Sequence, residues 1–179
     1  MKTIFATLGA LFVLLSSIQA PSQTSAYAGG EQREIKALSD QQVSDYLAGN
    51  GMGYARAAEL NHYPGPKHAL AMAEQLRLTS EQTIAAQKIL HQMQADAQRL
   101  GANIVKKERA LDALFASGRA DPEAVSISTA QIAQLEGRLR AAHLQAHVAM
   151  RGLLTREQVR SYDQLRGYGH KHQDESHSH

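Results

Sequence analysis

Histidine and carboxylate side chains at helical spacing are the residues of this sequence that could do chemistry. His143 and His147 stand four positions apart, so on a helix their imidazoles share one face and can chelate Zn²⁺, Cu²⁺ or Ni²⁺ once a third ligand joins them. Glu59, His62 and His68 flank the segment YPGP and are the candidates for that ligand. The alternative for the pair is an interfacial position with ordinary hydrogen bonds. An i,i+4 pair alone lacks the third ligand of a complete zinc motif, so the metal stays open among zinc, copper and nickel.

The carboxyl-terminal tail is a second candidate for metal binding. It reads GHKHQDESHSH over residues 169–179, and we expect it to be disordered. Such a composition binds late first-row divalent metals readily but without geometric selectivity. The alternative is a solubilising tail whose histidines are incidental. The histidines concerned are His170, His172, His177 and His179.

Patterns typical of enzymes are missing from the sequence. It has no cysteine, no HExxH and no Ser-His-Asp order. The glycines at 49, 51 and 53 lack GxGxxG spacing and follow no strand pattern, which indicates a hinge rather than a phosphate loop. The formal net charge of +2 calls for neither nucleic acid nor anionic lipid as a partner. We expect a non-enzymatic protein that requires no cofactor, with a divalent transition metal as the one candidate.

One short phrase recurs three times and marks where helices begin. LSDQQ, LTSEQ and LTREQ start at residues 38, 78 and 154. In each, a hydroxyl can accept from the backbone N–H three residues on, while the glutamine side chain reaches back to the N–H of the capping residue. We therefore interpret the phrases as structural capping boxes. The capping residues of the two closer copies are Thr79, Gln82, Thr155 and Gln158.

Two long segments place apolar residues at alternating steps of three and four, the rhythm of packed amphipathic helices. The first runs over residues 80–116, and GRADP at 118–122 ends it, because proline cannot continue the hydrogen-bond ladder. The second follows to about residue 153. Two such helices joined by a short turn lie antiparallel.

Shorter helices complete the predicted fold. LSDQQ opens one that continues to residue 47 and resumes over 54–60, and LTREQ opens another that reaches about residue 166. No segment alternates with period two, so we expect no strands. The predicted fold class is all-α: a long antiparallel helical hairpin with shorter N- and C-terminal helices.

Residues 1–28 have the features of a secretory signal peptide. A lone lysine precedes an apolar run that is too short for a membrane span, and Ala26-Tyr27-Ala28 is a small-x-small cleavage pattern. A cut after Ala20 is the competitor, but Pro21 would then follow the scissile bond. We expect cleavage near Ala28, a periplasmic location without a stable membrane anchor, and a single helical domain over 29–168.

The combination of LTSEQ and LTREQ with a long helical hairpin in an exported, cysteine-free chain resembles the Spy/CpxP group of periplasmic proteins, which carry LTxxQ motifs. ZraP-like zinc-resistance proteins and CnrX-like heavy-metal sensors are relatives of that group. The likeness covers the layout of residues 58–168, with LSDQQ as a looser third copy. It implies a cradle-shaped homodimer that works by binding, either to unfolded envelope proteins or to metal with a membrane signalling protein as partner.

Two departures from the group bear on function. Spy-like chaperones have a basic concave face, whereas basic residues here are only modestly in excess. CnrX-like sensors have a transmembrane anchor, which this chain lacks once the signal peptide is cleaved.

An apolar stripe on the second long helix is the candidate client-binding surface. Leu144 and Val148 fall on the side away from the Leu135 and Leu139 stripe, so a dimer partner, the N-terminal helices or a client could cover them. The basic residues nearby are Arg138, Arg140 and Arg151. The first expectation is an ATP-independent chaperone of the envelope stress response, and the alternative is a heavy-metal sensor or buffer.

Overall fold

The structure, a computed structural model, describes residues 24–168 of the chain. Its elements are η1 (Gly30–Gln32), α1 (Asp40–Ala48), α2 (Arg56–Glu59), α3 (Pro66–Ala71), α4 (Ser80–Ala116), α5 (Pro122–Leu153) and α6 (Arg156–Leu165). No strand occurs in this part of the chain, so the predicted all-α class is confirmed. Most of the predicted signal peptide, residues 1–23, and the histidine-rich tail lie outside the described residues.

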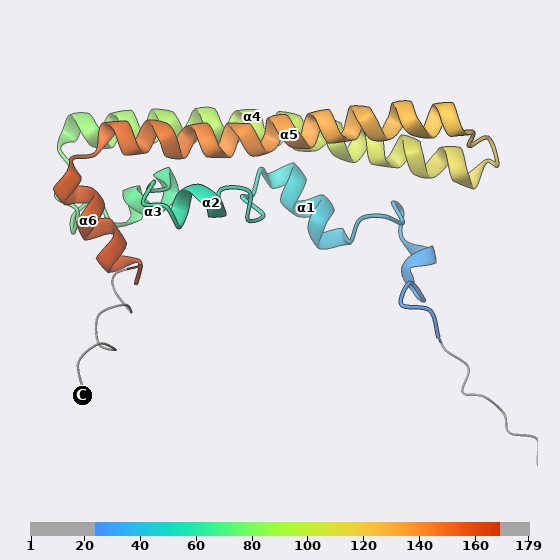
Figure 1. The fold of residues 1–179 in the computed structure, drawn as a ribbon, viewed down its shortest axis with the longest axis horizontal. Coiled ribbons are helices and arrows are strands. Elements are labelled where there is room, and N and C mark those ends of the chain that lie inside the picture. Colours follow the sequence, from blue (N-terminus) through green and yellow to red (C-terminus); the bar gives the residue numbers. More distant parts are fainter. Residues whose placement is uncertain (1–23, 169–179) are drawn as a thin grey trace, which may run out of the picture.

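Two long helices, α4 and α5, lie side by side along the length of the molecule (Figure 1). Helix α4 ends at Ala116, at the predicted stop. The backbone N–H of Ala124 donates to the Asp121 carboxylate at 2.9 Å, which caps the start of α5. Pro122 occupies the first position of α5, where a missing N–H costs no hydrogen bond. Their shared stripe is buried, as the apolar rhythm predicts, and includes Ala97, Leu100, Ile104, Ile132 and Leu139.

Helices α1, α2 and α3 form a second layer along one side of this pair, and α6 folds back at its end (Figure 1). Helix α1 packs closely on α4 because position 101 is a glycine. A Cβ there would overlap the backbone carbonyl of Tyr46. Gly49 then ends α1 in a left-handed conformation, with φ of 69°.

The core consists of two apolar clusters. The first joins α1, α4 and α5 and includes Tyr46, Leu100 and Leu139. The second lies near the other end, where α3, α4, α5 and α6 meet around the fully buried Met150 and Tyr162. Along α5, the buried polar residues His143 and His147 lie between Leu139 of the first cluster and Met150 of the second.

All three predicted capping boxes are present, at Ser39, Thr79 and Thr155. The structure adds a connection that the sequence did not predict. The side-chain amides of Gln82 and Gln158 donate to each other's oxygen at 2.9 Å in both directions. Gln158 also donates to the carbonyls of Leu76 and Arg77, at 3.3 and 3.4 Å. We call this pair with its two caps the capping junction; it ties the start of α4 to the start of α6.

Helix α3 was not among the helices predicted from the sequence, and its start lies within the YPGP segment. The second proline of that segment, Pro66, is the first residue of α3. None of the helices within residues 24–168 combines the length and apolarity that a membrane crossing requires.

Candidate functional site

A cavity of about 360 Å³ lies between the second layer and the two long helices. The side chains of Glu59, His68, His143 and His147 all line it, and we call it the histidine cavity. The structure therefore brings together four of the five core residues predicted as metal ligands, from α2, α3 and α5. The fifth, His62, is elsewhere: its Nδ1 lies 2.8 Å from a carboxylate oxygen of Asp163. The tail histidines lie outside the described residues.

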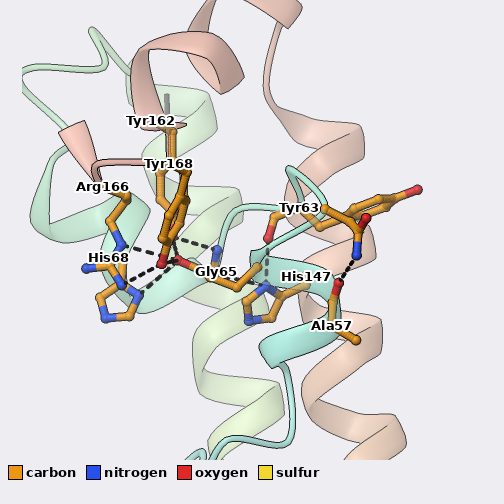
Figure 2. A network of polar contacts seen from close by, with 10 residues as sticks. Ala57, Tyr63, Gly65, His68, His147, Tyr162, Arg166 and Tyr168 are labelled. Atoms are coloured by element: carbon orange, nitrogen blue, oxygen red, sulfur yellow. Dashed lines mark hydrogen bonds and ion pairs between the residues drawn. The ribbon is translucent and has the colours of Figure 1, made fainter. Parts of the chain in front are cut away.

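Glu59 is the centre of a polar network with Tyr162, Arg166 and Tyr168, three residues that Figure 2 labels. Its Oε1 accepts from the hydroxyl of Tyr162 at 2.6 Å, from Arg166 Nε at 3.2 Å and from the hydroxyl of Tyr168 at 3.2 Å. Burial, and next the hydrogen bond to Glu59, raise the pKa of Tyr162, so this hydroxyl stays a donor. The backbone N–H of Gly65 donates in turn to the Tyr162 oxygen at 3.2 Å.

His147 is held in one tautomer by the backbone. Its Nδ1 lies 2.8 Å from the carbonyl oxygen of Tyr63 and 3.6 Å from Glu59 Oε2 (Figure 2). A carbonyl can only accept, so Nδ1 carries a proton, and Nε2 is the nitrogen that has the lone pair in the neutral ring. This arrangement is typical of metal-binding histidines, in which the other ring nitrogen donates to a carbonyl or carboxylate. It is also the ordinary hydrogen bond that was the alternative interpretation of the pair.

His143 is buried without a partner for one of its nitrogens. The residue is only 3% exposed, and its Nε2 has no hydrogen-bond partner among the described residues. Its ring stacks on that of Tyr54, with 6.0 Å between centroids. Burial, and next the charge of His147, lower the pKa of His143, so the neutral ring is favoured. Most buried polar groups in proteins are satisfied, and this orphaned nitrogen therefore calls for an explanation.

His68 is the accessible member of the set. Its side chain is 46% exposed, and Nδ1 lies 3.8 Å from Glu59 Oε1. Burial, and next the Arg166 charge, lower the pKa of His68. At neutral pH this imidazole is therefore an uncharged group at the mouth of the cavity.

Gly65 leaves space against the His147 ring. A Cβ at this position would lie 3.0 Å from Cε1 and 3.1 Å from Nε2 of His147, closer than ordinary van der Waals contact. The backbone φ of Gly65 is −82°, which any residue can adopt. The glycine is therefore favoured by the close approach to His147, whose ring would have to shift slightly to admit a Cβ, rather than by the backbone.

The ligands are gathered but not yet arranged around an ion. Within residues 24–168, no three His, Cys, Asp or Glu side chains stand in a group that could hold a metal as they are. Glu59 is engaged by its three donors, and the exposed His68 is free to rotate. Metal binding at this site would therefore include a movement of His68 or an exchange of partners at Glu59.

Several residues of the site were missed by sequence reasoning. Tyr162 and Arg166 are four apart on α6 and so share a face, a signal that was available. Nothing in the sequence connected that face with Glu59. The cavity is also lined by residues that carried no predicted role, among them Met52, Met93, Arg56 and Lys67.

The predicted client-binding surface is only partly open. Val148 is 58% exposed, whereas Leu144 is half-buried. Arg140 precedes Leu144 by four positions and Arg151 follows Val148 by three, so these side chains share one flank of α5. Arg138 is exposed but lies off this flank.

Comparisons with protein-family models, with curated proteins and with solved structures find no match to this chain. The functional argument therefore depends on the site.

Proposed function

We propose that this is an exported, non-enzymatic protein that binds a transition metal ion in the histidine cavity, as a periplasmic sensor or buffer of the ZraP-like or CnrX-like kind. The observation that carries the proposal is the convergence of Glu59, His68, His143 and His147 on one cavity. Their sequence separation is large, and three separate helices supply them. A set of carboxylate and imidazole ligands of this kind suits first-row transition metals.

Two features of the cavity favour a ligand over a structural role. His143 Nε2 is a buried nitrogen without a hydrogen-bond partner among the described residues, which costs about 1–3 kcal/mol unless something binds to it. Gly65 keeps a methyl group away from His147 Nε2. Both features leave a ring nitrogen without a protein partner, and a metal ion could bind there once that nitrogen is deprotonated.

The test is calorimetry with Zn²⁺, Cu²⁺ and Ni²⁺ on the full chain in which all four tail histidines are replaced by Gln. We call this chain the tail-silent variant. We expect one ion per chain, and a loss of affinity of about 10–100-fold or more when His143→Gln or His147→Gln is added. His91→Gln is the matched control, because His91 is exposed on α4 away from the cavity.

Gly65→Ala tests the same site without removing a ligand. The added methyl would stand against His147 Nε2, so we expect weaker binding while the hydrogen bond from the Gly65 N–H to Tyr162 remains. If the tail-silent variant binds no metal, the proposal is wrong and any binding by the natural chain belongs to the tail.

A second candidate function is the ATP-independent chaperone that the family resemblance implies, acting as a cradle-shaped homodimer on unfolded envelope proteins. The exposed Val148, flanked by Arg140 and Arg151, supports it. The test is suppression of aggregation of a reduced client at stoichiometric ratio, with Val148→Asn compared with Ile127→Asn. Both side chains are more than half exposed, but only Val148 lies on the proposed surface. Equal effects of the two substitutions, or no suppression by the natural chain, would remove this candidate.

A further inference from the structure

The histidine cavity contains sulfur as well as nitrogen. Met52, from the loop after α1, and Met93, from α4, line it together with His143 and His147 of α5. A thioether is a neutral, soft and polarisable donor. Soft thioether ligands select Cu(I), and imidazole also binds copper well, whereas structural and catalytic zinc sites use thiolate, imidazole and carboxylate.

Met52 occupies an unusual backbone position for a residue with a side chain. Its φ is 43°, between two glycines at 51 and 53. A left-handed conformation is uncommon for residues other than glycine and costs free energy. Met52 is 37% exposed and contributes to the cavity lining. Glycine would be the ordinary residue there, so a methionine at this position has a cost that a ligand role explains.

The charges around the cavity discriminate between ions of different charge. Arg56, Lys67 and Arg166 line it, against a single carboxylate, Glu59, which already pairs with Arg166. Coulomb repulsion from these cations is twice as large for a dication as for a monocation. A monovalent ion held by neutral ligands is therefore less penalised than Zn²⁺ or Ni²⁺.

We infer that the ion bound in this cavity is Cu(I), coordinated by His143 and His147 with the thioethers of Met93 and Met52. The inference rests on the metal-binding function proposed above. It specifies the ion, and it assigns the two methionines, rather than Glu59 and His68, as the ligands beside His143 and His147. Helix α4, helix α5 and the loop after α1 would each contribute at least one ligand.

Competition titration tests the choice of ion. The tail-silent variant is titrated anaerobically with Cu(I), prepared with ascorbate, against a chromogenic Cu(I) chelator, and separately with Zn²⁺ against a zinc chelator. We expect Met93→Leu to weaken Cu(I) binding by about tenfold or more, a loss of the size seen for residues that support metal sites. Zn²⁺ affinity should change little. Leu is a near-isosteric replacement for Met, and Met72→Leu, outside the cavity in the second core cluster, is the matched control.

X-ray absorption at the copper edge gives an independent readout. The chain has no cysteine, so any sulfur bound to copper must come from methionine. We expect sulfur scattering from the tail-silent variant and its loss in the Met52→Leu/Met93→Leu double variant, with helicity unchanged by circular dichroism.

The outcomes separate the two proposals. If the tail-silent variant binds neither Cu(I) nor Zn²⁺, the metal-binding function itself is wrong. If it binds metal through His143 and His147 but Zn²⁺ binds more tightly than Cu(I), or Met93→Leu behaves like Met72→Leu, only the assignment of copper is wrong.

Discussion

The capping junction and the histidine cavity both place polar side chains beside the long helices, but they treat their hydrogen bonds differently. At the capping junction, Gln82 and Gln158 pair with each other, with their own capping residues and with backbone carbonyls. In the histidine cavity, His143 Nε2 has no partner among the described residues, while Glu59 Oε1 accepts from three donors at once. A satisfied polar network fixes a structure, whereas an unsatisfied buried group costs stability and is retained for another reason.

The difference teaches how to separate structure from function in this molecule. The repeated phrase that dominates the sequence builds the junction, where each glutamine closes a helix start and joins it to another. The histidines are less conspicuous in the sequence. They line the cavity in which one buried ring nitrogen has no hydrogen-bond partner among the described residues. Four predictions test this division, beginning with the largest expected effect.

Gln158→Ala should be the most destabilising of these substitutions. It removes the acceptor of the Thr155 backbone N–H and both hydrogen bonds with Gln82. The Leu76 and Arg77 carbonyls also lose this donor. We expect the free energy of unfolding to fall by about 2–3 kcal/mol, since several bonds are lost together. Urea denaturation measures it.

Gln42→Ala is the control for the capping junction. Gln42 closes the same kind of box with Ser39 at the start of α1, and it makes no further side-chain hydrogen bond. We expect a loss of about 1 kcal/mol, the usual cost of a lost cap. Equal losses for Gln42→Ala and Gln158→Ala would show that the connection between α4 and α6 contributes nothing.

His143→Leu, in contrast, should stabilise the metal-free protein. The substitution replaces an unsatisfied buried ring with an apolar side chain, so we expect the free energy of unfolding without metal to rise by about 1 kcal/mol. Metal binding should be lost at the same time. Thermal and urea unfolding on the metal-free, tail-silent variant measure the gain.

His147→Leu is the matched comparison on the same helix face. It removes the bond to the Tyr63 carbonyl, so we expect destabilisation by about 1–2 kcal/mol. If both substitutions destabilise equally, His143 has a structural role and the contrast between the two regions fails.

Much of the helix layout follows from local rules, and the sequence predicted it. The capping boxes predicted where α1, α4 and α6 begin. The apolar periodicity and Pro122 predicted where α4 ends and α5 begins. Helix α3 was missed because a proline that breaks one helix can begin the next, and local propensity does not distinguish the two uses.

The site could be predicted only as a list of residues. The spacing of His143 and His147 predicted that they share a helix face, but it did not predict that both are buried. They are buried because the second layer covers that face, which the pattern of α5 alone does not reveal. The partners of Glu59 are also distant in the sequence, with Tyr162 lying 103 positions after it, and no helical spacing relates them.

Thr155→Ala should lower the free energy of unfolding by less than Gln158→Ala does, and it should leave metal binding unchanged. Thr155 accepts from the Gln158 N–H at 3.2 Å as the N-cap of α6. We expect a loss of about 0.5–2 kcal/mol on removal of the hydroxyl, and almost none for Thr155→Ser, which keeps an acceptor. Thermal unfolding and metal titration are measured on the same two variants. An alanine variant that melts like the natural chain but no longer binds metal would contradict the structural role of the phrase.

The pH dependence of stability should show the smallest effect, and its sign follows from the cavity. The pKa of His143 and that of His68 are both lowered in the folded protein, by burial first. The unfolded chain, with histidine pKa near 6.5, then binds more protons than the folded chain in mildly acidic solution. Stability that is present above about pH 6.5 is therefore lost as the pH falls below it. The other titratable or charged groups that line the cavity are Glu59, His147, Arg56, Lys67 and Arg166.

Replacement of the buried His143 should make the stability of the protein depend less on pH. We expect urea unfolding of the metal-free, tail-silent variant to show decreasing stability from about pH 7.5 to 5.5, and His143→Gln to reduce the slope, because Gln does not titrate in this range. His91→Gln, on the exposed side of α4, should leave the slope unchanged. A slope that is the same in both variants would mean that His143 titrates normally in the folded protein. The neutral buried imidazole, on which the contrast with the capping junction depends, would then have to be given up.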